Sequence, residues 1–138
     1  MQYAPAVIQY LEEQQGYRPG ACNIGPAEIR RRQAGGVLGI VAAFGLGALL
    51  LILDAPPLAR LLVALPLAGG FAGFLEARLH FCGNYGWRGI RNLGAIGDIE
   101  RVEDAEARRA DRRKALAIFG TAAAGGLAVA LLFALLPI

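Results

Sequence analysis

The apolar residues of this chain gather in three long blocks, and nearly all of its charged residues lie between the blocks. The first block, Gln33 to Leu53, holds 21 residues without a charge, and the third, Ala115 to Ile138, holds 24. A helix of about 20 apolar residues crosses the ~30 Å hydrocarbon core of a bilayer, because each residue adds about 1.5 Å. Both blocks therefore predict transmembrane helices.

The second block is shorter, because only 15 residues between Arg60 and Glu76 lack a charge. An arginine near a helix end can extend its guanidinium to the lipid headgroups, so we expect a span that includes Arg60. With three spans, 13 of the 14 Lys and Arg residues fall on one side of the membrane. The positive-inside rule makes that side cytoplasmic, and a two-span arrangement would lose this asymmetry.

The predicted fold class is all-α: an integral membrane protein with a single membrane domain and three transmembrane helices. We expect these helices at about residues 33–53, 56–77 and 115–137. The first two spans form a hairpin, and Pro66 should kink its second helix because proline has no N–H group to donate.

Four segments follow one another along the chain. They are a cytoplasmic N-terminal segment, the transmembrane hairpin, a cytoplasmic loop with a charged helix, and the third span: 1–25, 26–77, 78–114 and 115–138. A short helix is expected at residues 4–15. The charged helix is expected to begin near Ile99 with Asp98 as its N-cap, and to continue into the third span.

Composition and charge fit a bacterial inner-membrane protein. Hydrophobic residues make up 56% of the chain, above the roughly 45–50% of soluble domains. The Ala-, Gly- and Arg-rich style is typical of a GC-rich genome. The first 20 residues show no signal peptide, so the first span would act as an uncleaved signal. The N-terminus would be cytoplasmic and the C-terminus periplasmic.

The net charge of +3 follows from arginines placed where topology needs them. These basic residues would contact anionic lipid headgroups at the membrane surface, and they do not form a nucleic-acid-binding face. The interfacial set is Arg30, Arg31, Arg32, Arg112, Arg113 and Lys114.

Small residues recur at four-residue spacing in each block, which allows helix backbones to approach closely. The helix-packing residues expected from this spacing are Gly35, Gly39, Ala43, Gly47, Gly69, Gly73, Gly120 and Ala124. In the third span a second set, Ala122, Gly126 and Ala130, lies beside the first. These rows predict tight helix contacts within the chain or with another chain.

Two similar turns contain the only cysteines: "CNIGPAEIRRRQ" at 22–33 and "FCGNYGWRGIRN" at 81–92. The hairpin places both at the cytoplasmic surface, so we expect the turns to be neighbours in space. Three interpretations remain open for Cys22 and Cys82. They are buried structural thiols, a redox pair activated by nearby arginines, or metal ligands together with His80.

No cofactor is expected from the sequence. A zinc or iron–sulfur site would need four cysteines from an oligomer, because the chain has no C-x-x-C pair. His80 is the only histidine. It is more simply an interfacial polar residue beside Glu76 than a haem or pigment ligand. No catalytic set of nucleophile, base and acid appears, so we expect no enzyme activity.

The two cysteine turns resemble those of small, uncharacterised bacterial inner-membrane proteins with a CNIGPxEI…C pattern. The resemblance covers roughly Cys22 to Asn92 and implies no activity.

Three functions remain as hypotheses. The first is a non-catalytic accessory or assembly subunit of an inner-membrane complex, with lipids and other membrane subunits as partners. The second is a small redox-active or metal-binding membrane protein that uses Cys22 and Cys82. The third is a homo-oligomeric transporter, although no ionisable residue lies in the middle of a span, where transport pathways usually carry one.

Overall fold

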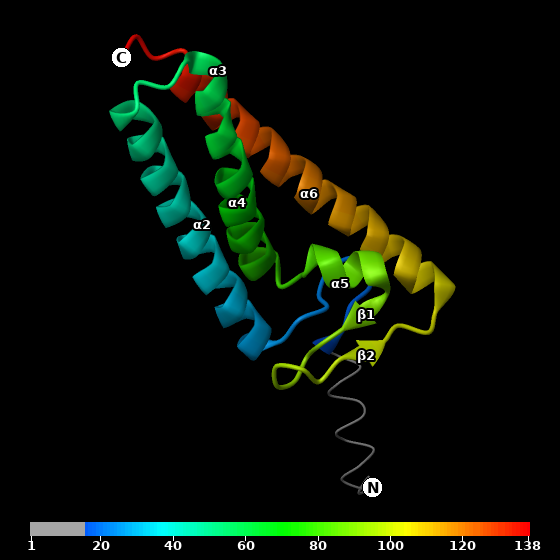
Figure 1. Cartoon of the computed structure of the whole chain (residues 1–138). Helices are drawn as coiled ribbons and strands as arrows, with labels where there is room; N and C mark the ends of the chain where they lie inside the picture. The colour runs from blue at the N-terminus through cyan, green and yellow to red at the C-terminus, as the bar shows by residue number, and fades with distance from the viewer. Residues whose placement is uncertain (1–15) are drawn as a thin grey trace, which may run out of the picture. The chain divides into compact units, whose positions relative to one another are not determined.

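The computed structural model describes residues 16–138, so the short helix expected at 4–15 lies outside the described residues. The described chain is mostly helical, as expected for the all-α class, with one small two-stranded sheet. Its elements (Figure 1) are α2 (Pro26–Ile52), α3 (Pro57–Arg60), the 3₁₀ turn η1 (Leu61–Val63), α4 (Ala64–Leu79), α5 (Gly83–Arg88), β1 (Ile90–Arg91), β2 (Glu100–Arg101) and α6 (Ala105–Ala134).

Three helical stretches are long and apolar enough to cross a membrane: Pro26–Ile52, Pro57–Leu79 and Ala105–Ala134. Each of the three expected spans falls on one of them. Helix α2 begins well before the first apolar block, with Pro26 at its start and Glu28 in its first turn, where the helix dipole favours a carboxylate. The charged segment and the third block form one continuous helix, α6.

The chain divides into two compact units. The polar unit consists of residues 16–30 and 76–116, and the apolar unit of residues 31–75 and 117–138. Loops, short elements and helix ends build the polar unit. Long stretches of α2, α4 and α6 build the apolar unit.

Within the apolar unit, α2 and α4 meet at glycines and run antiparallel (Figure 1). Gly39 faces Gly70, and Gly36 faces Gly73. A Cβ atom placed on Gly39 would lie 2.6 Å from the Cα of Gly70, and one placed on Gly73 would lie 2.7 Å from the nitrogen of Gly36. The two backbones therefore touch at positions where only glycine fits.

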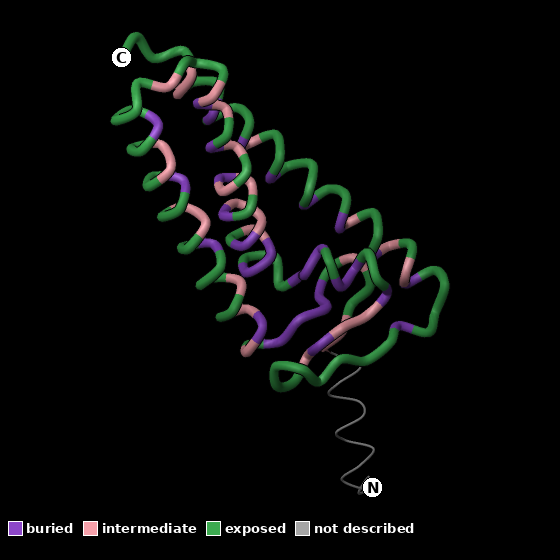
Figure 2. Tube along the Cα trace, viewed as in Figure 1, coloured by how far each residue is buried: buried purple, intermediate pink, exposed green. Residues whose placement is uncertain are grey.

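Buried positions in α2 recur every seven residues, at Gly36, Ala43 and Leu50. Figure 2 shows buried stretches at intervals along this helix. A seven-residue repeat averages 3.5 residues per contact, as in coiled coils. A strict four-residue row drifts away from such a seam. Gly39, Ala43 and Gly47 therefore lie at or beside the contact, whereas a Cβ on Gly35 would meet no atom within 4 Å.

The contact between α4 and α6 uses the second of the two rows expected in the third span, Ala122, Gly126 and Ala130. Gly126 of α6 packs on the backbone of Ala64 and Ala68. Ala122 and Ala130, one turn on either side of Gly126, are buried. Gly120 and Ala124, each two residues before a buried position, are exposed, because two residues carry a helix more than half a turn around its axis.

In α4 the expected packing residues divide in the same way. Gly73 is buried against α2, but Gly69 is exposed and a Cβ there would meet nothing within 4 Å. Among residues 16–138, the exposed small residues of the expected rows are thus Gly35, Gly69, Gly120 and Ala124. The neighbouring glycines Gly36 and Gly70 were not among the residues expected from the spacing, and both are buried at the contact.

Pro66 affects the helix one turn before itself. Without an N–H group it cannot donate to the carbonyl of Leu62, and the 3₁₀ turn Leu61–Val63 separates α3 from α4 at this level. The irregularity expected at Pro66 is therefore a change of helix type.

Arg60 is buried, so the expectation that it extends to the lipid headgroups is wrong. Its Nε donates to the carbonyl of Ala55 at 3.3 Å, Nη1 donates to Leu136 O at 3.2 Å, and Nη2 donates to Ile138 O. The guanidinium lies 5.9 Å from the ring centroid of Phe133. Carbonyl groups near the end of a helix lack helical partners, and Arg60 supplies donors for those that follow α6.

In the polar unit, β1 and β2 pair antiparallel, with Ile90 opposite Arg101. The charged helix was expected to begin near Ile99, after Asp98, and this expectation is wrong because the segment pairs as a strand instead. The chain there is extended, and α6 begins only at Ala105. Asp104 is the N-cap residue, since its Oδ2 accepts a hydrogen bond from Ala107 N at 3.1 Å.

Candidate functional site

The two cysteine turns lie against each other in the polar unit, as the hairpin predicted. The side chain of Asn23, in the first turn, forms two hydrogen bonds with the backbone of Cys82 in the second turn. Cys82 N donates to Asn23 Oδ1 at 2.7 Å, and Asn23 Nδ2 donates to Cys82 O at 3.1 Å. The backbone of Asn23 is also bonded, to His80 O at 3.1 Å and from Asn92 N at 2.9 Å. All four polar groups of this fully buried asparagine are therefore satisfied.

A buried carboxylate lies beside this contact. Glu28, in the first turn of α2, accepts hydrogen bonds from Tyr85 Oη at 3.3 Å and from Asn92 Nδ2 at 3.4 Å. Glu28, Asn92 and Tyr85 are all buried. Asn92 continues the link, because its backbone oxygen accepts from Gly25 N at 2.9 Å. The start of α2 is thus joined to α5 and to the residue that follows β1.

The glycines of the two turns have the same structural role, whereas their asparagines do not. A Cβ on Gly25 would collide with the backbone of Leu93, and one on Gly86 would lie 2.7 Å from the ring of Phe81. Both glycines therefore permit close approach. Asn23 is buried, whereas Asn84 is exposed.

Cys22 and Cys82 are buried thiols, and no disulfide joins them. Cys22 Sγ lies 3.7 Å from Ile24 O, within the range of a weak S–H hydrogen bond. Cys82 packs with Ile24 and Tyr85 in a small apolar cluster. The two cysteines considered as a pair in the sequence analysis are therefore two free thiols, both buried within the polar unit.

His80 differs from the two buried cysteines in its exposure to solvent. It is exposed, and it has a φ of +55°, the left-handed conformation that ends α4. Glu76, expected beside it, accepts a hydrogen bond from Gly83 N at 3.3 Å. Within residues 16–138, no group of three or more His, Cys, Asp and Glu side chains is arranged to hold a metal ion.

A second anchor in the polar unit joins the N-terminal loop to α6. Asp111, fully buried, accepts hydrogen bonds from Tyr17 Oη at 2.6 Å and from Gly20 N at 2.7 Å. The guanidinium of Arg91 lies 4.8 Å from the centroid of the Tyr17 ring, and Arg91 also pairs with Glu100 at 3.1 Å. Tyr17 therefore connects the loop, α6 and the β-hairpin.

Burial sets the electrostatics of this anchor, which precedes the uncharged part of α6. Desolvation raises the pKa of the Asp111 carboxyl, while the hydrogen bonds from Gly20 and Tyr17 act in the opposite direction. Desolvation raises the pKa of Tyr17 well above its ordinary value of 10.0, and the hydrogen bond to Asp111 and its charge add to the effect. Tyr17 therefore stays protonated and donates over the whole physiological range.

The expected interfacial charges lie within α2 and α6, directly before the uncharged stretch of each helix. Arg30, Arg31, Arg112 and Arg113 are exposed, and Arg32 and Lys114 are partly buried. Arg112 Nε donates to Trp87 O at 3.3 Å, with its guanidinium 5.6 Å from the Trp87 ring centroid. Trp87 is exposed, whereas its neighbour Tyr85 is buried against Glu28.

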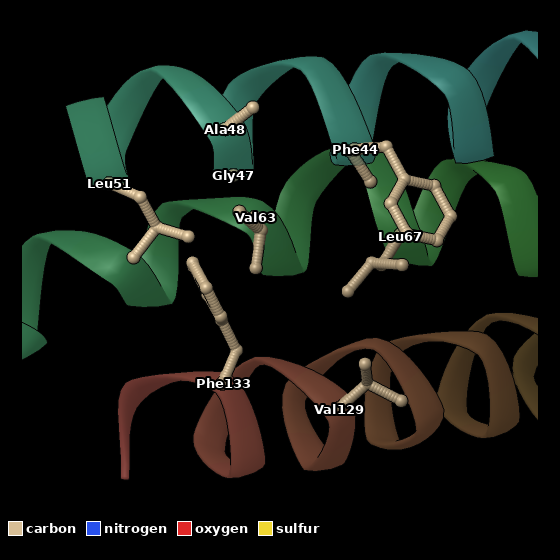
Figure 3. A pocket seen from close by; sticks show the side chains of 9 residues that line it. Phe44, Gly47, Ala48, Leu51, Val63, Leu67, Val129 and Phe133 are labelled. Atoms are coloured by element: carbon tan, nitrogen blue, oxygen red, sulfur yellow. The ribbon is translucent and has the colours of Figure 1, made fainter. Parts of the chain in front are cut away.

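The apolar unit contains a groove of about 350 Å³ between α2, α4 and α6 (Figure 3). Its lining is almost wholly apolar: Ala43, Phe44, Gly47, Ala48, Leu51, Val63, Leu67, Val129 and Phe133. Phe44 is largely exposed, and a Cβ atom placed on Gly47 would lie 3.7 Å from the Phe133 ring. Such a surface can accept apolar groups but offers no group for chemistry.

The sequence drew attention to the cysteines, but the groups that organise this region are their polar neighbours. Asn23, Glu28, Asn92 and Asp111 were not among the expected site residues. One signal was present in the sequence, because Asn23 follows Cys22 directly in a turn rich in glycine. Asp111 carried no such signal, since it lies within a run of charged residues that resembles a solvated helix face.

Comparison with known proteins gives no match: no family model, no curated protein and no solved structure is similar to this chain.

Proposed function

We propose that this chain is a non-catalytic accessory or assembly subunit of a bacterial inner-membrane complex. The apolar groove between α2, α4 and α6 carries the proposal. In this proposal a transmembrane helix of another subunit lies in the groove. Within a bilayer, helices associate through close packing rather than through removal of apolar surface from water. A concave wall that contains Gly47 and Ala48 suits such packing.

The long helices leave ample surface for a partner. In the most apolar part of each, only 17% of the residues of α2, 28% of those of α3–α4 and 22% of those of α6 are buried. The chain would lie with its N-terminus in the cytoplasm and its C-terminus in the periplasm, because 13 of its 14 Lys and Arg residues then face the cytoplasm.

The polar unit supports a scaffolding role over an enzymatic one. Its buried polar side chains hold backbone segments together: Asn23 binds Cys82, and Asp111 binds Gly20. Groups engaged in this way stabilise a shape that a partner can recognise.

A photo-crosslinking amino acid in place of Phe44 tests the groove directly. We expect ultraviolet light to give one discrete product that contains a second membrane protein. The matched control carries the same amino acid at Leu65, which is also exposed but does not line the groove. Equal products at both positions, or a product with another copy of this chain alone, would contradict the proposal.

A redox role for Cys22 and Cys82 is the second candidate. It is favoured by the hydrogen bonds between Asn23 and Cys82, which hold the two cysteine turns against each other. Oxidation of both thiols by diamide would form one disulfide, with loss of two hydrogen atoms to the reagent. Intact mass measurement should detect this loss in the wild type but not in Cys22→Ser or Cys82→Ser. A wild-type chain that keeps both thiols after treatment would remove this candidate.

A further inference from the structure

Arg112 and Trp87 form a pair on the surface of the polar unit. The side chain of Arg112 stacks near the Trp87 ring and is fixed by its Nε hydrogen bond to Trp87 O. A guanidinium has five N–H donors, and this bond uses one. Among residues 16–138, the terminal nitrogens of Arg112 have no hydrogen-bond or carboxylate partner. The pair thus presents donors whose orientation is already set.

The pair lies at the level where a membrane surface is expected. Arg112 precedes Ala115, the first residue of the uncharged segment of α6, by three residues. This spacing is about 4.5 Å along the helix. Trp87 is 49% exposed, and tryptophan is enriched at the boundary between lipid and water.

The surroundings are positively charged. Arg88, next to Trp87, and Arg113, next to Arg112, are exposed, and neither has an ion pair within the described residues. The nearest acid along α6, Asp111, is buried and bonded to Tyr17 and Gly20. The local charge is therefore not neutralised by the contacts that the structure describes.

We propose that Trp87 and Arg112 bind the phosphate of an anionic phospholipid headgroup, an inference that rests on the membrane location in the proposed function. The planar guanidinium matches two phosphate oxygens, and the indole N–H supplies a further donor. A net negative headgroup is preferred over a zwitterionic one because the neighbouring arginines are not neutralised.

Trp87 is the only tryptophan of the chain, so its fluorescence reports on this site alone. The full chain in neutral detergent micelles is titrated with phosphatidylglycerol, or with phosphatidylcholine of the same acyl chains. We expect a saturable change with phosphatidylglycerol at a concentration about fivefold lower, the factor for roughly one arginine contact. Salt at about 0.5 M should reduce this preference by screening.

Arg112→Gln should weaken the binding of phosphatidylglycerol about fivefold, while Arg88 and Arg113 keep part of its preference over phosphatidylcholine. Arg112→Lys should weaken the binding less than Arg112→Gln, because lysine retains charge but not the planar fork. Arg101→Gln is the matched control, since Arg101 is also an exposed arginine of the polar unit, and it should behave as the wild type. Equal losses in Arg112→Gln and Arg101→Gln would overturn the site in favour of net charge.

Two further results would overturn the proposal. One is an equal response to the two lipids in the wild type. The other is the same saturation with inorganic phosphate, which would indicate a site for free anions. None of these results depends on crosslinking at Phe44, so failure of the lipid site and failure of the proposed function are distinguishable.

Discussion

In the apolar unit, helix backbones meet at glycines, whereas in the polar unit buried side chains hold loop backbones by hydrogen bonds. Gly39 against Gly70 represents the first kind of contact, and Asn23 against Cys82 the second. The first needs the absence of a side chain at a given position. The second needs one particular side chain, with both its donor and its acceptor in place.

This difference indicates where each unit is vulnerable. A backbone contact tolerates exchange at all positions that point elsewhere, such as Gly35. A buried hydrogen-bonded contact fails when one atom is removed, because the partner left behind is both desolvated and unsatisfied. The polar unit should therefore be more sensitive to single polar substitutions, and the apolar unit to added volume.

The largest expected effect is at Asn23. Asn23→Ala leaves the buried N–H of Cys82 without its acceptor. It also removes one of the two donors to Cys82 O, which still accepts a hydrogen bond from Gly86 N at 2.9 Å. The unsatisfied N–H costs about 1–3 kcal/mol, and the second lost bond about 1 kcal/mol. We expect a loss of about 2–4 kcal/mol in the free energy of unfolding, measured by circular dichroism in detergent. Asn84→Ala is the control, since Asn84 is an exposed asparagine of the other turn. Equal stability of the two variants would contradict the assigned role of Asn23.

The next effect tests the backbone contact of the apolar unit. Gly39→Ala places a methyl group 2.6 Å from Gly70 Cα, and overpacking of this kind costs about 1–3 kcal/mol. Gly35→Ala, in the same helix, meets open space and should not lower the unfolding temperature. If both substitutions lower it equally, the glycines serve the helix itself rather than the contact.

A smaller and pH-dependent effect is expected at Tyr17. Tyr17→Phe removes the hydrogen bond to Asp111 and should cost about 1 kcal/mol near pH 7. The pKa of Tyr17 is raised in the folded chain, so this stabilisation is fully present below pH 10.0 and is lost as the pH rises further toward the folded pKa. The difference in unfolding temperature between wild type and variant should therefore begin to shrink only above pH 10.0. A constant difference would argue against the Tyr17–Asp111 bond.

The smallest expected effect is an increase in stability, and its size should be similar in the two units. Asp54 and His80, after α2 and α4, have positive φ values of +52° and +55°. Glycine adopts this conformation without the cost of about 1 kcal/mol that other residues carry. Asp54→Gly and His80→Gly should each raise stability by about this amount in thermal unfolding. A large loss in His80→Gly alone would show that its side chain has a structural role.

The apolar unit followed from the sequence because its pattern is long and repetitive. Uncharged blocks predicted the three long helices, and the segment 26–77 expected for the hairpin begins at the first residue of α2. The choice of contact face was harder, since Gly120 and Gly126 are equally small. Only the seven-residue repeat of buried positions in α2 and the row through Gly126 in α6 distinguish the two faces.

The polar unit followed only in outline. The expected proximity of the two cysteine turns is confirmed by the bonds between Asn23 and Cys82. The start of α6 was not predicted, because Asp98 and Asp104 are equally good N-caps and the pairing of β1 with β2, with Ile90 opposite Arg101, decides between them. The role of Asp111 was also hidden, because its partners Tyr17 and Gly20 are about 90 residues away.

Native mass spectrometry of the full chain, extracted gently from its own membrane with metal analysis of the same sample, is the most direct test of an accessory role. We expect a mass that contains other membrane subunits, and the same mass for Cys22→Ser and Cys82→Ser. A lone monomer would contradict the proposed function. A homodimer with iron or zinc at one site per two chains would also contradict it, and would assign the function to Cys22 and Cys82.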